Sequence, residues 1–255
     1  MKVIFIGDIV GSPGRQAVSK LLSKLKRQFK PDYVIANAEN CAGGRGITPD
    51  TAQELLQYGI DVLTSGNHIW AQKDIIEQMN GTLPLIRPLN YPPGVPGKGY
   101  IILGDIMVVN LMGRVFIANL DCPFRAMDAL LEKIKDRPKV VIVDFHAEAT
   151  SEKVAMGHYL DGRVNAVIGT HTHVATADNR ILSKGTAYIT DAGMTGPIDS
   201  VIGDDKEAVI NRFLTAMISR LPVAKGKTMF NAVLIELNED NGKATSIERI
   251  YEEVD

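Results

Sequence analysis

The sequence predicts an α/β fold in which a β-sheet core is covered by helices. Two observations carry this prediction. Short apolar runs rich in β-branched residues alternate with amphipathic stretches, and 45% of the 255 residues are hydrophobic, which is enough for one large core. No internal repeat, low-complexity segment or linker interrupts the sequence, so we expect residues 1–255 to form a single domain.

The N-terminal part is expected to alternate strand, helix, strand, helix, strand. Its short apolar runs predict strands at residues 2–7, 33–36 and 60–64. After the first run, Val18, Leu22 and Leu25 recur at helical spacing. This apolar stripe predicts a helix over residues 14–29.

The second helix has clear signals at both ends. Thr48 is the expected N-cap, and Pro49 suits the first helical position because that residue needs no backbone N–H. Gly59 is expected to end the helix. A shorter helix is predicted at about residues 73–79.

Prolines and glycines dominate the next segment, between residues 83 and 117. Two apolar runs at 100–103 and 106–111 predict a hairpin, with Gly104-Asp105 as its turn. The remaining elements are expected to be a helix at 125–135, a strand at 140–145, a helix at 152–160, a strand at 164–168, a strand pair, a helix at 206–220 and strands at 230–237 and 245–251.

The charge balance and the length of the apolar runs exclude several classes of protein. Lys plus Arg number 28 and Asp plus Glu 30, so no stable complex with nucleic acid is expected. No apolar run approaches the roughly 20 residues that span a bilayer, and Asp8 interrupts the N-terminal run too early for a signal peptide. We therefore expect no membrane partner. Cys41 and Cys122 form no CxxC pair and fit reduced thiols in a cytoplasmic protein.

Side chains that can bind metals follow five of the predicted strands. In chain order they are Asp8, then Asn37, Glu39 and Asn40, then Asn67 and His68, then His146, and finally His171 and His173. Each one alone is typical of a turn or of a packed histidine. Because the carboxyl ends of strands share one edge of an α/β sheet, we expect them to converge there as a metal site. On extended backbone, His171 and His173 would point both rings to the same side.

The number and chemistry of these side chains favour two metal ions. The candidate ligands are Asp8, Glu39, Asn40, Asn67, His146, His171 and His173. They exceed the four ligands of a tetrahedral zinc site, whereas two ions about 3.5–4 Å apart that share a carboxylate would use them all. Mixed carboxylate, amide and imidazole donors suit manganese, iron or zinc. Two divalent ions outweigh two carboxylates, so the centre should attract a phosphate ester anion.

A glycine-rich segment, Gly43-Gly44-Arg45-Gly46, follows the second group of candidate ligands. Arg45 could bind a substrate phosphate through its guanidinium group. The alternative is a flexible turn with an exposed arginine. The segment lacks the GK[ST] ending of a P-loop and is no GxGxxG fingerprint.

Taken together, these motifs resemble the calcineurin-like metallophosphoesterase superfamily. The matching segments are GD at residue 7, GNH at residue 66, His146 and GTHTH at residue 169. Three departures, Val10 in place of a histidine, NAEN in place of a second GD motif and Ile69 in place of an acid, resemble a bacterial subgroup, the YmdB-like metallophosphoesterases. The motifs similar to this subgroup are GDIVGSPGR from Gly7, NAEN from Asn37, SGNHIW from Ser65, DFHAEATSEK from Asp144, GTHTHV from Gly169 and DAGMTGPIDSVIG from Asp191.

The resemblance implies a four-layer α-β-β-α sandwich and phosphodiesterase activity on cyclic nucleotides, of the 2',3'- or 3',5'-cyclic type, or on related phosphodiesters. It also implies a role for each candidate residue. Glu39 would bridge two ions, Asp8 and His173 would hold the first, Asn67, His146 and His171 would hold the second, Asn40 would take the contact that Val10 leaves vacant, and His68 would stand beside the metals.

With this arrangement, we expect a hydroxide held between the ions to attack phosphorus in line, while His68 protonates or stabilises the leaving oxygen. Two other classes of protein stay open. One is a regulatory protein on the same fold that senses a nucleotide with little turnover. The other is a metal-free Rossmann-like dinucleotide binder, which the missing GxGxxG motif disfavours. A homo-oligomer is compatible with the sequence.

Overall fold

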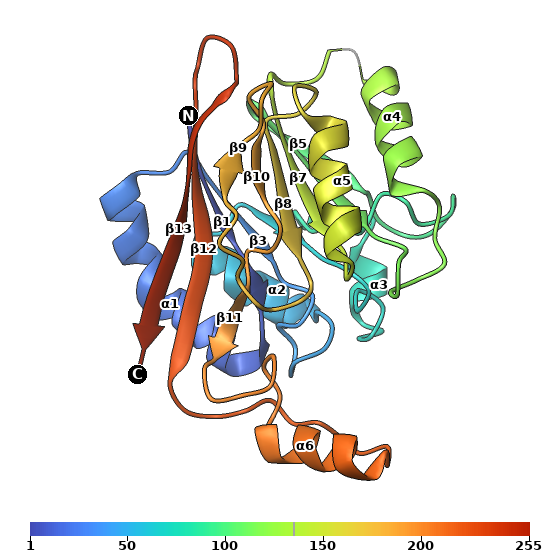
Figure 1. The fold of residues 1–255 in the computed structure, drawn as a ribbon, viewed down its shortest axis with the longest axis vertical. Helices are drawn as coiled ribbons and strands as arrows, with labels where there is room; N and C mark the ends of the chain where they lie inside the picture. Colours follow the sequence, from blue (N-terminus) through green and yellow to red (C-terminus); the bar gives the residue numbers. More distant parts are fainter. Residues whose placement is uncertain (135) are drawn as a thin grey trace.

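Two β-sheets pack face to face, and helices lie on the outer face of each, in the computed structural model of the chain (Figure 1). The structure describes residues 1–134 and 136–255. The expected end of the helix at 125–135 therefore lies outside the described residues.

The first sheet has the strand order β2-β11-β12-β1-β3-β4, and β13 pairs with β12. Its strands are β1 (Lys2–Ile6), β2 (Asp8–Ile9), β3 (Tyr33–Asn37), β4 (Val62–Thr64), β11 (Met194–Pro197), β12 (Thr228–Leu237) and β13 (Ala244–Val254). The pairs β1–β3 and β3–β4 are parallel, whereas β12 runs antiparallel to β1. The carboxyl ends of β1, β3 and β4 therefore point to one edge of the sheet.

The second sheet has the order β5-β6-β7-β8-β10-β9. Its strands are β5 (Tyr100–Leu103), β6 (Ile106–Met112), β7 (Val140–His146), β8 (Ala166–Thr170), β9 (Arg180–Ile181) and β10 (Ala187–Ile189). The expected hairpin is confirmed, because β5 and β6 pair antiparallel across Gly104-Asp105. The central strands β6, β7, β8 and β10 are parallel.

Helices cover both sheets, and a sixth helix stands apart. On the first sheet lie α1 (Gly11–Phe29), α2 (Pro49–Gln57) and α3 (Ile75–Gln78), and on the second lie α4 (Pro123–Lys133) and α5 (Thr150–Leu160). The last helix, α6 (Lys206–Thr215), lies beyond one end of the sheets (Figure 1). The N-cap prediction for α2 is confirmed: the Thr48 hydroxyl accepts a hydrogen bond from the Thr51 backbone.

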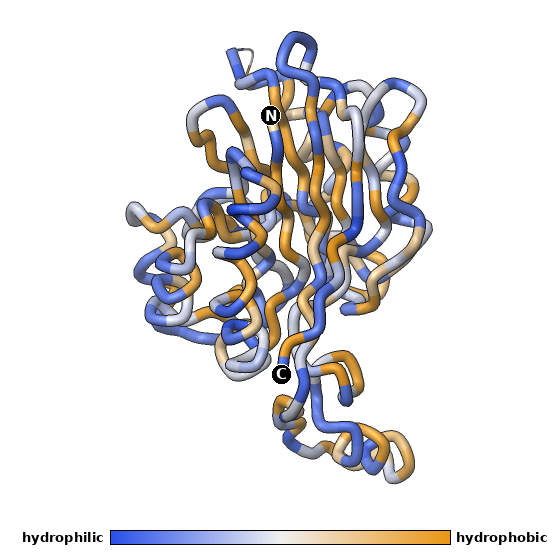
Figure 2. Tube along the Cα trace, turned by 90° about the vertical axis from the view of Figure 1, so that its left-hand side faces the viewer, coloured by the Kyte–Doolittle hydropathy of each residue, from blue (hydrophilic) through white to orange (hydrophobic). Residues whose placement is uncertain are grey.

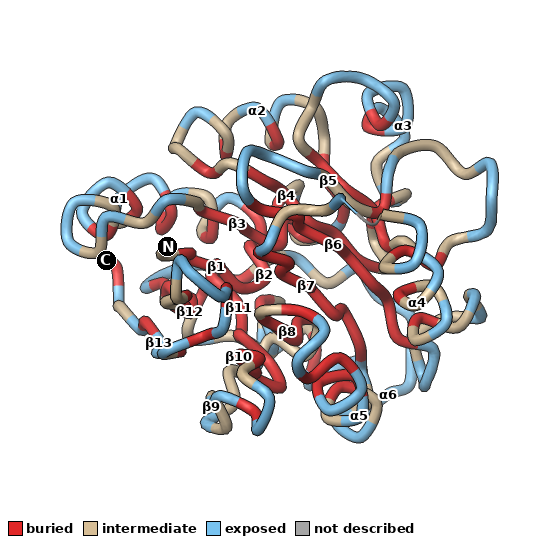
Figure 3. The backbone as a smooth tube through the Cα atoms, turned by 90° about the horizontal axis from the view of Figure 1, so that it is seen from above, coloured by how far each residue is buried: buried red, intermediate tan, exposed pale blue. Residues whose placement is uncertain are grey.

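Successive side chains of a strand point to opposite faces of its sheet, so each sheet packs against the other sheet on one face and against helices on the other. In β1, Val3 and Phe5 face the second sheet, whereas Ile4 and Ile6 pack under α1 and α2. The outer face of the second sheet forms a third apolar cluster with α4 and α5. Figure 3 shows the buried strands lying between the two groups of helices. The four-layer α-β-β-α prediction is therefore confirmed.

The largest differences from the predicted helix boundaries are at the start of α1 and the end of α6. Helix α1 begins at Gly11 rather than residue 14, since Pro13 fits its first turn, where no backbone N–H bond is needed. Helix α6 ends at Thr215 rather than residue 220, because Ala216 adopts a left-handed conformation with φ of 55°. Within the described parts of the chain, no helix is both long enough and apolar enough to cross a membrane.

Candidate metal centre

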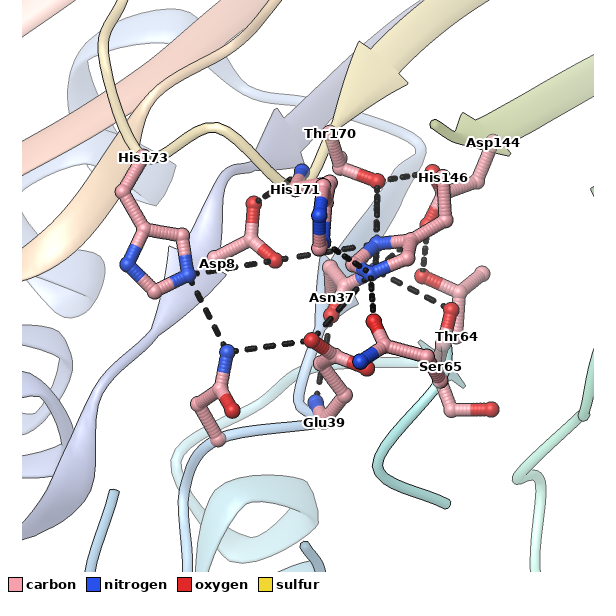
Figure 4. A network of polar contacts seen from close by, with 12 residues as sticks. Asp8, Asn37, Glu39, Thr64, Ser65, Asp144, His146, Thr170, His171 and His173 are labelled. Carbon is pink, nitrogen blue, oxygen red and sulfur yellow. Dashed lines mark hydrogen bonds and ion pairs between the residues drawn. The ribbon is translucent and has the colours of Figure 1, made fainter. Parts of the chain in front are cut away.

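The candidate ligands converge at one edge of the sandwich, where strands of both sheets end. Asp8 follows β1, Glu39 follows β3 and Asn67 follows β4 in the first sheet, while His146 closes β7 and His171 follows β8 in the second. Figure 4 shows the side chains from these distant segments pointing toward one another. The predicted convergence at the strand ends is therefore observed.

Three acceptor atoms lie close to the imidazole of His146 in this cluster. His146 Nε2 lies 3.1 Å from Glu39 Oε1, 3.0 Å from Asn67 Oδ1 and 3.0 Å from His171 Nδ1. The ligand atoms of Glu39, His146 and His171 all lie within 4.8 Å of one another. When the imidazoles are neutral, such facing lone pairs have no hydrogen to share, so the arrangement fits a cation.

A second group of donors surrounds Asp8. Its Oδ1 atom is buried and has no hydrogen-bond partner among residues 1–134 and 136–255. It lies 3.8 Å from His146 Nδ1 and 3.9 Å from His173 Nε2, while Oδ2 accepts a hydrogen bond from the His171 backbone. A buried carboxylate oxygen without a partner is costly, and a metal ion would satisfy it.

The side chain of Asn40 points its amide nitrogen toward Glu39 and His173. Its Nδ2 donates to Glu39 Oε1 at 3.1 Å and lies 3.1 Å from His173 Nε2. To bind an ion, the amide would turn its oxygen inward, since only that atom carries a lone pair for a metal. The structure thus places Asn40 beside Glu39 and His173.

Burial and the neighbouring charges shift the pKa values of the groups at the centre of the cluster. Burial opposes charge on His146, yet the nearby carboxylates of Glu39 and Asp8 raise its pKa to about 9. Burial and the neighbouring His146 lower the pKa of His171 to about 3, so this imidazole is neutral and offers a lone pair. Burial would raise the pKa of Glu39, but His146 and His68 hold it well below its usual range.

The second nitrogen of each histidine is held by a partner. His146 Nδ1 lies 2.9 Å from Thr170 Oγ1, which in turn donates to the buried carboxylate of Asp144. His171 Nε2 lies 3.0 Å from a carboxylate oxygen of Glu148. His173 Nδ1 lies 2.6 Å from a backbone carbonyl, that of Ile202, and therefore carries the proton. These contacts fix each ring with one nitrogen facing the site, as second partners do for metal-binding histidines.

The backbone of the histidine segment is not extended, so that prediction was wrong. His171 and His173 both have positive φ, 103° and 65°. This rarely populated backbone is held by Asp191, whose Oδ2 accepts from the backbone N and the hydroxyl of Thr172. The same oxygen lies 2.6 Å from Lys153 Nζ in a buried ion pair. Tertiary contacts therefore override the local expectation.

Glycine at position 66 lets the two sheets bring their ligands together. A Cβ atom there would lie 2.3 Å from His146 Nε2 and 2.4 Å from Glu39 Oε2. These distances leave no room for a side chain. Gly66 is therefore part of the site, although it offers no ligand.

His68 and Arg45 lie next to the cluster. The His68 backbone N donates to Glu39 Oε2 at 3.0 Å, and Arg45 Nε donates to His68 Nδ1 at 3.2 Å. Burial lowers the pKa of the half-buried His68. Arg45 is exposed on its glycine-rich turn and lies beside His68.

Sequence reasoning assigned no role to four residues that support the ligands, although the motifs quoted from Asp144 and Asp191 contain them. They are Asp144, Glu148, Lys153 and Asp191. Asp144 could have been recognised from the sequence, since a single acidic side chain inside an apolar strand is buried and needs hydrogen-bond partners. The ion pair between Lys153 and Asp191 gave no such signal, because the two residues are 38 positions apart in the sequence.

Comparisons with known proteins were consistent with this site. A family model described as YmdB-like protein matches residues 4–250. The chain is 49% identical over 254 residues to the 2',3'-cyclic-nucleotide 2'-phosphodiesterase of Bacillus subtilis (strain 168), covering 98% of this chain and 96% of that protein. A crystal structure of a hypothetical protein from Thermus thermophilus is similar with a TM-score of 0.93 and 44% identity, covering 99% of each chain. The resemblance inferred from the motifs is confirmed.

The fold is shared more widely than the sequence. The calcineurin-like phosphoesterase YfkN from Bacillus subtilis matches 99% of this chain and 90% of its own, with a TM-score of 0.58 and 10% identity. At this identity the likeness concerns the fold alone.

Proposed function

The chain belongs to the YmdB-like family, and from this membership we propose that it is a metal-dependent phosphodiesterase acting on cyclic nucleotides of the 2',3'- or 3',5'-cyclic type. The name of the Bacillus subtilis relative supports the substrate class. The observation that carries the proposal is the buried, unpartnered Asp8 oxygen beside the acceptors of Glu39, His146 and His171. Residues 1–255 would act as one domain.

The donor set suits two divalent transition-metal ions, manganese or iron foremost and zinc as an alternative. Asp8, His173 and Asn40 would hold the first ion, Asn67, His146 and His171 the second, and Glu39 both. When bound, such ions act as Lewis acids on phosphoryl oxygens and lower the pKa of a coordinated water toward neutrality.

His68 would act on the leaving oxygen. Because its Nδ1 accepts from Arg45, the neutral ring carries its proton on Nε2. That N–H can donate a hydrogen bond to the oxygen that leaves phosphorus, where negative charge develops. The lowered pKa of His68 favours this neutral donor over full proton transfer.

Arg45 would orient the substrate. Its Nε is engaged by His68, whereas its Nη groups form no hydrogen bond within the described residues. They are therefore free to bind a non-bridging phosphate oxygen.

Both cysteines, Cys41 and Cys122, are free thiols, which supports a cytoplasmic location.

The test uses the purified chain, stripped of metal and reloaded with manganese. We expect hydrolysis of bis(p-nitrophenyl) phosphate and of 2',3'- and 3',5'-cyclic AMP. His68→Ala should lower kcat by about 100- to 1,000-fold while both ions stay bound, and Asp8→Asn should lose metal as well as activity. His158→Ala, at an exposed histidine on α5, is the matched control and should behave as the native chain.

Each departure from these results has a defined meaning. Loss of metal in His68→Ala would make His68 a ligand. Tight nucleotide binding without turnover by the native, metal-loaded chain would contradict the enzyme and favour the nucleotide sensor. A native chain that retains no manganese after dialysis would contradict the metal centre itself.

A further inference from the structure

Helix α6 presents its apolar stripe to solvent. Ile210, Phe213 and Leu214 recur at the i, i+3, i+4 spacing of a helix face that normally packs on a protein core. Their exposed fractions are instead 52%, 82% and 81%, and Met217 and Ile218, just beyond the end of the helix, are 68% and 94% exposed. We call these five side chains the α6 face. A pattern typical of a packed helix thus lacks a partner within the described part of the chain.

Hydrogen-bonded structure, rather than an irregular loop, connects helix α6 to the sandwich. The arm, residues 199–224, leaves the sandwich at one end and carries α6 away from both sheets (Figures 1 and 2). Asp204 forms β-bridges with Val201 and Val223 at the base of the arm. Asp205 caps the helix by accepting from the Ala208 backbone, and Val209 is buried. This support holds the α6 face in an outward direction.

The apolar area of the α6 face is close to what a dimer requires. Burying one side chain of this size removes on the order of 100 Å² of apolar surface from water, so the partly exposed five supply roughly 400 Å² per copy. A standard interface buries about 800 Å² per partner, of which about 65% is apolar in homodimers. The α6 face alone therefore supplies most of the apolar area of a homodimer interface.

The charges around α6 favour self-association over a strongly charged partner. Within the helix, Glu207 and Arg212 have opposite signs. Lys206 is paired with Asp199 at 2.5 Å. With charges of both signs beside the α6 face, no like-charge repulsion opposes a second copy, and no single sign selects an acidic or basic partner.

We propose that the α6 face packs against the same face of a second copy of this chain, related by two-fold symmetry. A two-fold contact uses one patch twice, so an apolar stripe on each copy is self-complementary. Because α6 lies beyond the ends of the sheets (Figure 1), the contact would join the two arms.

The test measures the mass of the full chain by light scattering after gel filtration, over a series of concentrations. The native chain should have twice the mass of one copy. Phe213→Asp should raise the dimer Kd at least about 30-fold, as expected for a central aromatic side chain, and give the mass of one copy. Phe116→Asp is the matched control, since Phe116 is 91% exposed but lies outside the arm. It should keep the native mass.

Ile218→Asp is a second variant that leaves the helix itself unchanged, because residue 218 lies beyond the end of α6. It should also weaken the dimer, and both arm variants should keep the circular dichroism spectrum of the native chain. The proposal is overturned if the native chain has the mass of one copy throughout the series. It is equally overturned if Phe213→Asp and Ile218→Asp keep the native mass, since the interface would then lie elsewhere.

Discussion

Replacing Lys153 by methionine removes the cation from the buried ion pair behind the histidine segment. Lys153 Nζ lies 2.6 Å from Asp191 Oδ2, and the two side chains are 1% and 0% exposed. Methionine keeps much of the volume of the lysine stem, so the change isolates the charge. Asp191 would keep its hydrogen bonds from Thr172 and Gly193 but would have no cation beside it.

The expected loss of stability follows from this burial. Removing one partner of a buried pair costs about 3–5 kcal/mol, because the other charge stays desolvated and uncompensated. The hydrogen bonds that Asp191 keeps place the loss near ~3 kcal/mol. For a chain of this size, that corresponds to a fall in Tm of roughly 6–12 °C.

Urea unfolding followed by circular dichroism measures the loss, and manganese titration measures its effect on the site. Lys206→Met is the matched control, because Lys206 and Asp199 form a pair of similar length, 2.5 Å, with side chains 47% and 75% exposed. Its unfolding midpoint should equal that of the native chain. If Lys153→Met unfolds at the same urea concentration as Lys206→Met, the reasoning about the buried pair is refuted.

Three further predictions concern the site and its surroundings. Glu148→Gln should weaken manganese binding by about 10- to 100-fold, measured by calorimetry, because the carboxylate partner of His171 is lost; unchanged affinity would show that this contact is incidental. Gly66→Ala should abolish metal binding, since a Cβ would collide with two candidate ligands; a metal analysis that finds the native metal content would contradict this geometry. Cys41 should not react with a thiol reagent at pH 8 in the folded chain, because burial raises its pKa to about 11. Only Cys122 should be counted before unfolding, and two thiols counted in the native state would disprove the assignment.

The sequence alone predicted most of the elements in their order and the residue types that gather at the site. The hairpin turn at Gly104-Asp105 and the cap of α2 at Thr48 depend on neighbouring residues, which a linear pattern contains. The same holds for ligands placed directly after strands, since a strand end is a local feature and parallel strands share an edge. For this reason Asp8 and His146 could be assigned to one cluster although they are 138 residues apart.

Tertiary structure alone decided how the ligands are held. The positive φ of His171 is stabilised by Asp191 and Lys153, and its outer nitrogen is held by Glu148. The spacing of apolar residues in α6 likewise predicts which side chains share a face, but not whether that face meets the sheets or solvent. Both features depend on distances between segments that only the packing of the two sheets sets, and periodicity along the chain carries no information about those distances.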